Sequence, residues 1–255
     1  MKGISNKFNK MDEQINSNVA ATPVANGGDK VKKILYGLLI VVVLAIIAVI
    51  FSAFNRNNDA KYESVVVSSG EKFDDGDIDG AIAQLESYLK TNLTDNVRAN
   101  TLVSLASAYA QKGSLAFKEA EYSQKAIGTV KASLEINDNN AEAYRVMAYA
   151  YEIAQDYKNA IPNYEKAISL DSSNSASYAG LGHAYDLMGE LVKAQTNYEK
   201  ALTISPGLDY AQYNLAKVLY RARKVEQAVT LAQSVVKSSS NNRFIAESYL
   251  LIALS

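Results

Sequence analysis

The feature that most constrains this chain is a pair of short amphipathic helices that recurs every 34 residues. In residues 175–208 the apolar positions recur at three- and four-residue steps, which places them on one face of each predicted helix. Gly189 predicts the end of the first helix, and Pro206 follows the second because proline cannot continue a helix. The pattern starts again near Ala141 and Asp209. We therefore predict units that bury their apolar faces by stacking on copies of themselves.

This unit resembles the tetratricopeptide repeat (TPR) in its length and its signature positions. The residues that carry the resemblance are Tyr178, Leu181, Gly182 and Tyr185 in the first helix and Ala194, Tyr198, Ala201 and Pro206 in and after the second. Tyr178 stands where the family usually has tryptophan. The resemblance implies an all-α fold, a right-handed α-solenoid of about five repeats with a partial sixth.

The first two repeats are less regular than the later ones. In the first we expect Val65 to begin one helix and Gly76 to lie in the turn before the other. In the second we expect the turn at Gly113. Extra residues after this glycine displace the third repeat from the 34-residue period, so they should lengthen the helices or form a projecting turn. A sixth repeat should begin near Arg243.

An uncharged segment, residues 34–54, precedes the repeats. At about 1.5 Å per residue, a helix of this length spans about 31 Å, which is the thickness of a bilayer's hydrocarbon core. The run exceeds a typical signal-peptide core and no A-x-A site follows it, so we predict a permanent anchor. The predicted organisation is a disordered tail (1–29), a transmembrane helix with its basic flank (30–54), a polar linker (55–60) and the solenoid (61–255).

The flanking charges favour one orientation of this anchor. Lys30, Lys32 and Lys33 precede the span, whereas Arg56 and Lys61 follow it. The positive-inside rule then places the N-terminus in the cytoplasm and the repeats in a periplasm, cell exterior or organelle lumen. This arrangement resembles single-span bacterial inner-membrane proteins with a periplasmic TPR domain. An organelle import receptor with cytosolic repeats is the opposite-orientation alternative.

The sequence offers little for catalysis. His183 is the only histidine and there is no cysteine, so a triad or metal site would need this one ring to meet ligands from other repeats. The acidic run at 74–80 lacks EF-hand spacing, and we expect Asp77 or Asp79 to cap a helix instead. The chain has no glycine-rich phosphate loop, and its net charge of −1 gives no basic field for nucleic acid. We therefore predict a protein that is not an enzyme and that uses no cofactor or metal.

In the TPR family the first helix of each pair lines a concave groove that binds extended peptides or partner helices. The resemblance places ten residues of this chain in that groove: Arg145, Tyr149, Ala176, Ala179, His183, Tyr210, Tyr213, Lys217, Tyr220 and Arg221. Ala176 and Ala179 would form a small-residue floor between aromatic neighbours, which suits an apolar or aromatic segment. Val66, Gly70 and Ser104 replace the clamp that grips chaperone tails in some members, so this partner class is disfavoured.

Most of the seventeen tyrosines fall at repeat packing positions, where we expect the rings to fill gaps with the hydroxyl at the rim. The last predicted helix instead ends in an apolar run, YLLIAL. Either the natural chain continues beyond it, or Tyr249, Leu250, Leu251, Ile252 and Leu254 contact a partner or a second copy. The predicted function is a membrane-anchored interaction scaffold or assembly factor. A homopolymer or filament subunit is the alternative that this apolar run supports.

Overall fold

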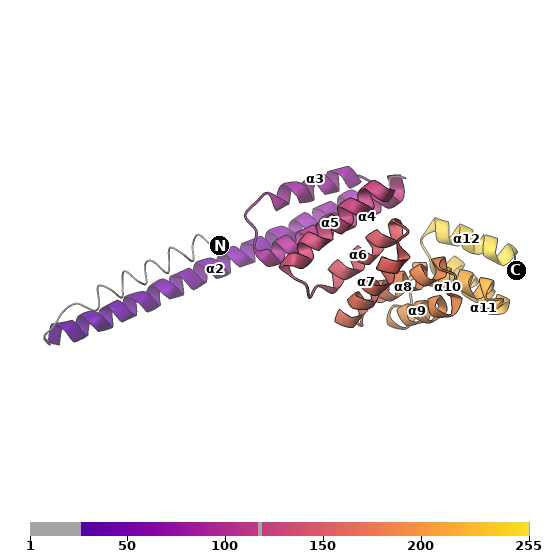
Figure 1. Ribbon diagram of the computed structural model, residues 1–255. Coiled ribbons are helices and arrows are strands. Elements are labelled where there is room, and N and C mark those ends of the chain that lie inside the picture. The colour runs from indigo at the N-terminus through magenta and orange to yellow at the C-terminus, as the bar shows by residue number, and fades with distance from the viewer. Residues whose placement is uncertain (1–26, 117–118, 255) are drawn as a thin grey trace. The chain divides into compact units, whose positions relative to one another are not determined.

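The structure is a computed structural model that describes residues 27–116 and 119–254, and every regular element among these residues is an α-helix (Figure 1). The chain divides into two compact units, Met1–Arg56 and Asn57–Ser255. The division falls within residues 55–60, the expected linker. These residues are helical, because a single helix, α2 (Gly27–Asp74), runs through them.

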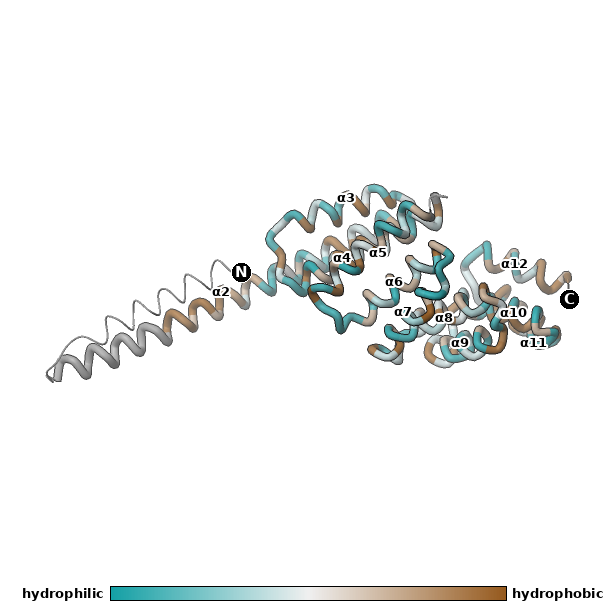
Figure 2. Tube along the Cα trace, in the orientation of Figure 1, coloured by the Kyte–Doolittle hydropathy of each residue, from teal (hydrophilic) through white to brown (hydrophobic). Residues whose placement is uncertain are grey.

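The first unit contains the predicted anchor. Residues 34–54 all lie in α2, and the side chains from Val42 to Phe54 are largely exposed to solvent. By length and composition, the Val42–Phe73 portion of α2 is apolar enough to cross a membrane. In Figure 2 the first part of this portion is mostly brown, and the part that follows is mostly teal and white. Most of the expected disordered tail lies outside the described residues, but residues 27–29 begin α2 and are therefore helical.

The second unit is the predicted solenoid, and its described residues form ten helices in addition to residues 57–74 of α2. In each pair the first helix is called A and the second B. The B helices are α3 (Ile78–Leu89), α5 (Glu119–Ile136), α7 (Tyr157–Leu170), α9 (Leu191–Ile204) and α11 (Val225–Ser238). The A helices that follow α2 are α4 (Asp95–Ala116), α6 (Ala141–Ile153), α8 (Ser175–Leu187), α10 (Asp209–Arg221) and α12 (Asn242–Ala253). The 34-residue spacing of α6, α8 and α10 is confirmed.

Turns between A and B helices repeat the same backbone conformation. Gly76 and Gly189 have φ of 79°, in the left-handed region that glycine adopts without steric cost. Gln155 and Arg223 occupy the position of Gly189 in the neighbouring repeats, with φ of 58° and 62°. For a non-glycine residue this conformation costs about 1–2 kcal/mol. The turn geometry is therefore dictated by the stacked helices, even where the local residue disfavours it.

The second repeat differs from its expectation. Gly113 does not form the turn, because α4 continues through it to Ala116 and α5 begins at Glu119. The extra residues thus lengthen both helices, as one of the two alternatives predicted. Residues such as Val103, Ile127 and Val130 bury the shared face of this long pair. A glycine inside a helix costs only about 1 kcal/mol, which this packing outweighs.

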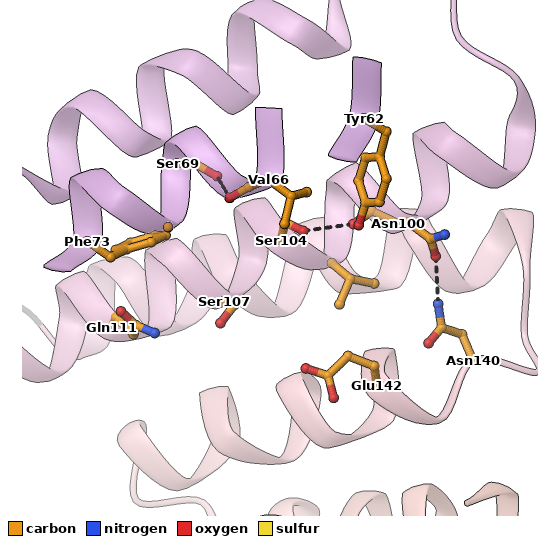
Figure 3. Close-up of a pocket in the computed structure, with 12 residues that line it drawn as sticks. Tyr62, Val66, Ser69, Phe73, Asn100, Ser104, Ser107, Gln111, Asn140 and Glu142 are labelled. Carbon is orange, nitrogen blue, oxygen red and sulfur yellow. Dashed lines mark hydrogen bonds between the residues drawn. The ribbon is translucent and has the colours of Figure 1, made fainter. Parts of the chain in front are cut away.

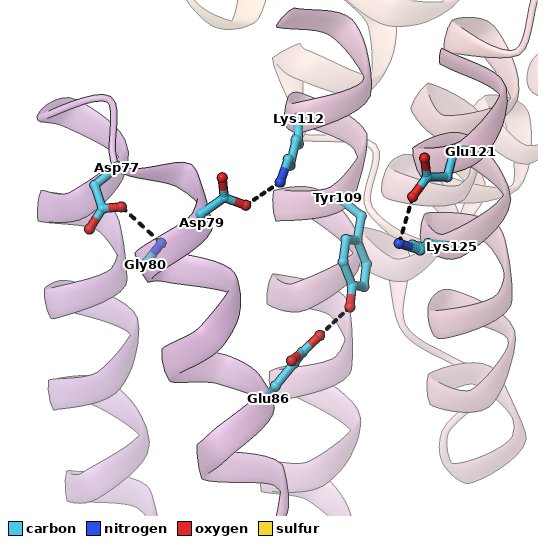
Figure 4. Close-up of polar contacts among 8 residues, drawn as sticks. All are labelled: Asp77, Asp79, Gly80, Glu86, Tyr109, Lys112, Glu121 and Lys125. Carbon is cyan, nitrogen blue, oxygen red and sulfur yellow. Dashed lines mark hydrogen bonds and ion pairs between the residues drawn. The ribbon is translucent and has the colours of Figure 1, made fainter. Parts of the chain in front are cut away.

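Polar contacts join the first two repeats (Figure 4). Asp77 caps α3 by accepting a hydrogen bond of 2.9 Å from the backbone N–H of Gly80. Asp79 forms an ion pair with Lys112 of α4, and Tyr109 donates a hydrogen bond to Glu86. The predicted capping role of Asp77 is confirmed, and the acidic run serves helix capping and inter-helix pairing.

Close contacts between tyrosine rings and glycines organise the core of the central repeats. Tyr164 of α7 packs against Gly180 of α8, and a methyl group added at Gly180 would lie 2.5 Å from two ring carbons. Tyr198 of α9 packs against Gly182 in the same way, with a corresponding distance of 3.1 Å. The Tyr198 hydroxyl is buried and makes no hydrogen bond among the described residues. It therefore does not lie at the rim, where the packing pattern predicts tyrosine hydroxyls.

Candidate functional site

The candidate site is a groove with a cavity volume of about 610 Å³, lined mainly by the A helices α6, α8, α10 and α12. We call it the aromatic groove. The A helices of successive repeats expose the same face on the same side of the stack, so their groove positions form a continuous row. The groove thus combines side chains from four successive repeats that are far apart in sequence.

One wall of this groove is a cluster of aromatic rings. Tyr213 stacks on Phe244 with ring centroids 5.4 Å apart and an interplanar angle of 21°. Tyr210 lies 6.4 Å from Phe244 and meets the His183 ring edge-on at 5.9 Å. Burial raises the pKa of both tyrosines, so both rings are neutral at physiological pH. The wall offers apolar area with a few polar groups, the composition typical of protein-binding hot spots.

A buried carboxylate lies beside this wall. Glu152 of α6 has a side chain only 9% exposed, and its Oε1 lies 2.7 Å from Nδ1 of His183. Its other oxygen accepts a hydrogen bond of 3.2 Å from the hydroxyl of Tyr164, which comes from helix α7. A buried carboxylate requires such partners to offset the loss of water. Glu152 therefore fixes the His183 ring in the groove, and this explains the position of the chain's only histidine.

The C-terminal end of the groove carries charges. Lys217 lies over the Tyr213 ring, with its Nζ 5.4 Å from the ring centroid. Arg243 pairs with Glu247 at 2.9 Å. Burial opposes the ionisation of Glu247, but hydrogen bonds from Tyr213 and Arg243 lower its pKa overall. Because Arg243 is already paired with Glu247, Lys217 is the cation at this end of the groove that is best placed to meet an acidic group of a partner.

Five of the ten predicted groove residues line the aromatic groove: Tyr149, His183, Tyr210, Tyr213 and Lys217. Their part in partner binding stays a prediction. Tyr149, His183 and Lys217 each occupy the ninth position of their repeat. Tyr210 and Tyr213 lie on α10, the helix that contributes the most aromatic side chains to the groove lining.

The other five predicted residues lie elsewhere. Ala179 is 2% exposed and packs in the hydrophobic core, so its methyl group is closed to a ligand, and the exposed Ala176 does not line the groove. Ala179 therefore does not offer its side chain as part of the expected floor, and the contact role of Ala176 stays a prediction. Arg145 is paired with Glu142, with Nε 2.7 Å from Oε2.

The last two predicted groove residues, on α10, are also engaged within the chain. Arg221 forms an ion pair with the buried Asp186. Tyr220 donates a hydrogen bond of 3.0 Å to the backbone carbonyl of Leu254. Both side chains join neighbouring repeats rather than line the groove, because each finds a partner one repeat away.

Helix α12 is apolar on two sides, but only one of them is exposed. Leu251 is buried and Ile252 packs against the same core cluster, so these two predicted contact residues stabilise the fold itself. Tyr249, Leu250 and Leu254 are 58%, 60% and 64% exposed. The surface available for an oligomer contact is therefore smaller than the sequence suggested.

Phe244 and Glu247 are groove residues that the sequence analysis missed. The signal was present, because one more 34-residue step from Tyr210 and Tyr213 leads to these two positions. Among the described residues, no group of three or more His, Asp or Glu side chains could hold a metal ion.

Comparisons with known proteins agree with the repeat fold. A sequence profile of the tetratricopeptide repeat family matches residues 141–174 and 175–207. The crystal structure of MamA is similar at 27% identity with a TM-score of 0.52, covering 67% of this chain and 93% of MamA. A search of curated protein sequences found no match.

Two further solved structures share the fold at lower identity. TTC0263, a thermophilic TPR protein of Thermus thermophilus, is 16% identical with a TM-score of 0.63, covering 76% of this chain and 100% of TTC0263. Pseudomonas aeruginosa pilF is 15% identical with a TM-score of 0.58, covering 78% of this chain and 90% of pilF. Both show the likeness of the fold alone.

Proposed function

We propose that this chain, whose solenoid is built of tetratricopeptide repeats, is a membrane-anchored scaffold or assembly factor that binds a segment of another protein in its aromatic groove. The repeat fold is a module for protein–protein interaction. The observation that carries the proposal is the aromatic wall of Tyr210, Tyr213 and Phe244, contributed by two repeats, in which Tyr213 stacks on Phe244 and no ring is fully buried. Rigid aromatic side chains give large contact area at small entropic cost.

The chemistry of the groove favours a particular kind of segment. An apolar or aromatic side chain would pack on the wall, and an acidic residue beside it would meet Lys217. Glu152 is engaged by His183 and Tyr164, so its carboxylate holds the histidine ring of the wall in place. We propose binding without catalysis, since no nucleophile and base come together among the described residues that line the groove.

The anchor is proposed from α2. Its apolar side chains between Val42 and Phe51 are exposed to solvent, and a bilayer would cover them. The lysines before the span favour a cytoplasmic N-terminus. The repeats would then lie in the periplasm of a bacterium and act close to the inner membrane.

A photo-crosslinking amino acid in place of Tyr213, introduced in the full chain in intact membranes, tests this function. We expect crosslinks to peptides of a different protein, identified by mass spectrometry. The matched control replaces Gln124, which is exposed on α5 outside the groove, and should give none of these peptides. Recovery of only this chain's own peptides from Tyr213 would refute the scaffold and support self-assembly.

Self-association is the second candidate function, favoured by the exposed Tyr249, Leu250 and Leu254. Replacing Leu250 by aspartate should reduce the assembly size measured by light scattering if α12 joins copies of the chain. An unchanged size would remove this candidate. The Leu251 side chain should be left intact in this test, because it belongs to the core.

A further inference from the structure

A second cavity, of about 330 Å³, lies within the solenoid between residues 62–73 of α2, helix α4 and the start of α6 (Figure 3). Several of its polar side chains are paired within the chain. The Ser104 hydroxyl donates a hydrogen bond of 3.2 Å to the backbone carbonyl of Asn100, and the Asn140 amide donates one of 3.3 Å to the Asn100 side chain. The second bond joins α4 to the start of α6, so these side chains serve the packing of the repeats.

The aromatic groove contains a polar atom that the chain leaves unused. The Nδ1 atom of His183 lies 2.7 Å from Oε1 of Glu152, and the other oxygen of that carboxylate accepts the Tyr164 hydroxyl. Among the described residues, no group forms a hydrogen bond with the second ring nitrogen of His183, Nε2, and this atom is not buried. The His183 side chain is 25% exposed and lines the groove, so Nε2 is open to a ligand.

The carboxylate determines which nitrogen of His183 carries the proton. A carboxylate accepts hydrogen bonds and donates none, so Nδ1 must be the donor in the contact with Glu152. A neutral imidazole has a single N–H, and its other nitrogen is then an acceptor. Glu152 therefore makes Nε2 of the neutral His183 ring a hydrogen-bond acceptor.

This acceptor lies beside the aromatic wall. The Tyr210 ring meets the His183 ring edge-on with 5.9 Å between centroids, and Phe244 lies 6.4 Å from Tyr210. A flat aromatic ring would pack well on this wall. Lys217, with its Nζ 5.4 Å from the centroid of the Tyr213 ring, forms no ion pair among the described residues and disfavours a second cation in the groove.

From these observations we propose that His183 selects a neutral aromatic side chain that donates a hydrogen bond, the indole of tryptophan. Indole is a donor with no acceptor, whereas a tyrosine hydroxyl is both and phenylalanine is neither. Its N–H would meet Nε2 of His183 while its ring packs on Tyr210 and Phe244. Glu152 is a positioning residue, because it acts by orienting His183. This inference rests on the proposed function, since it names the side chain that the aromatic groove takes.

The first test reads the protonated nitrogen directly by nitrogen-15 NMR of the full chain in detergent micelles. The chain has one histidine, so one pair of ring signals is expected. In buffer about two pH units above the ordinary pKa of histidine, Nδ1 should carry the proton and Nε2 should not. Glu152→Leu removes the acceptor and should give a mixture of both forms. A proton on Nε2 in the wild type, or unchanged signals in Glu152→Leu, would overturn the inference.

The second test measures the hydrogen bond with two probes of the same shape. N-acetyl-tryptophan amide and N-acetyl-benzothienylalanine amide differ in that a sulfur atom replaces the indole N–H. Each is titrated into the full chain, and the amide resonances of α8 and α10 report binding. We expect the indole probe to bind the wild type about fivefold more tightly, because the analogue leaves Nε2 unpaired. Equal affinity of the two probes would overturn the inference.

His183→Phe is the matched variant, since it keeps an aromatic ring and removes the acceptor. Both probes should bind it with the same affinity, and circular dichroism melting checks that this variant and Glu152→Leu fold. A preference for indole that persists in His183→Phe would show that His183 does not select it. N-acetyl-arginine amide tests a charged donor, and tighter binding of this probe than of the indole probe would contradict the proposal.

These outcomes separate the inference from the proposed function. If the two aromatic probes bind alike and Tyr213→Ala weakens both, the inference fails and the aromatic groove keeps its proposed role. If no probe binds, the inference also fails. The proposed function fails with it only where crosslinks from Tyr213 return this chain's own peptides alone.

Discussion

Replacing Gly180 by alanine should destabilise the central repeats although alanine is the better helix former. The added methyl carbon would lie 2.5 Å from two ring carbons of Tyr164 and 2.7 Å from its hydroxyl oxygen. Carbon atoms pack at about 3.5–4.0 Å, so the ring would have to move by about 1 Å. Tyr164 is 2% exposed and its hydroxyl is bonded to Glu152, which leaves little room for this movement.

The expected change in the free energy of unfolding combines two destabilising effects and one stabilising effect. Overpacking of a core costs about 1–3 kcal/mol, and a weakened hydrogen bond to a buried charge adds about 1–2 kcal/mol. The change from glycine to alanine in a helix returns about 1 kcal/mol. We therefore expect a net loss of about 2 kcal/mol, or about 5 °C in the melting temperature of a domain this size.

Urea unfolding followed by circular dichroism, together with amide hydrogen exchange over α7 and α8, measures this loss. Two other glycines give a matched series of alanine variants. At Gly182 the methyl group would lie 3.1 Å from the Tyr198 ring, so a smaller loss is expected there. At Gly70 the space is open, and alanine should stabilise by about 0.5–1 kcal/mol. If Gly180→Ala resists urea as well as Gly70→Ala does, Tyr164 is not fixed against α8 and the reasoning is wrong.

Three other changes have definite expected signs. Gln155→Gly should stabilise by about 1 kcal/mol in urea titrations, because it relieves a left-handed backbone at φ 58°. Gly189→Ala should destabilise by about 1–2 kcal/mol in the same assay, since φ is 79° there. The pKa of Glu247 is lowered in the folded protein, so ionised Glu247 stabilises the fold. This stabilisation is fully present above the ordinary pKa of 4.5 and is lost as the pH falls through the lowered pKa. The urea midpoints of the wild type and Glu247→Gln should therefore differ at neutral pH and converge as the pH falls through the lowered pKa of Glu247. A difference that stays constant with pH would contradict the assignment.

The repeat register was predictable because several local signals agree with the burial pattern. Asn140 and Asn174, one repeat apart, accept hydrogen bonds from the backbone N–H groups of Ala143 and Ser177 and so begin α6 and α8. The same spacing separates the turns and the apolar faces. Where capping, turn and core signals coincide, sequence alone places a helix to within a residue or two.

The second repeat was harder to predict because the local signal does not mark the end of the helix. Gly113 indicates a turn, but α4 continues through it to Ala116, although the α4 residues of the core cluster end at Ala110 and Leu115 is 67% exposed. The Tyr198 hydroxyl shows a related limit. A packing position predicts where the ring lies, yet the depth of its hydroxyl depends on the neighbouring repeats on both sides.

Three of the predicted groove residues, Arg145, Tyr220 and Arg221, are engaged by partners within the chain, two of them across a repeat boundary. Arg221 meets Asp186, and Tyr220 meets the carbonyl of Leu254, each across a repeat boundary. Ala179 is closed to a ligand for a different reason, since it is buried in a core cluster that also contains residues of α9 and α10. A groove position therefore predicts the side of the solenoid on which a residue lies, but the availability of its side chain depends on which partner lies one turn or one repeat away.

The core and the aromatic groove share one chain of contacts, and this links stability to recognition. Tyr164 packs on Gly180 within the core, and its hydroxyl holds Glu152, which in turn fixes His183 against Tyr210. A change at Gly180 should therefore disturb the groove as well as the fold. A change at Gly189, in a turn with open space around it, should lower stability while leaving the groove intact. If the two substitutions weaken peptide binding equally at the same loss of stability, the groove does not depend on the contact between Tyr164 and Gly180, and this reasoning is wrong.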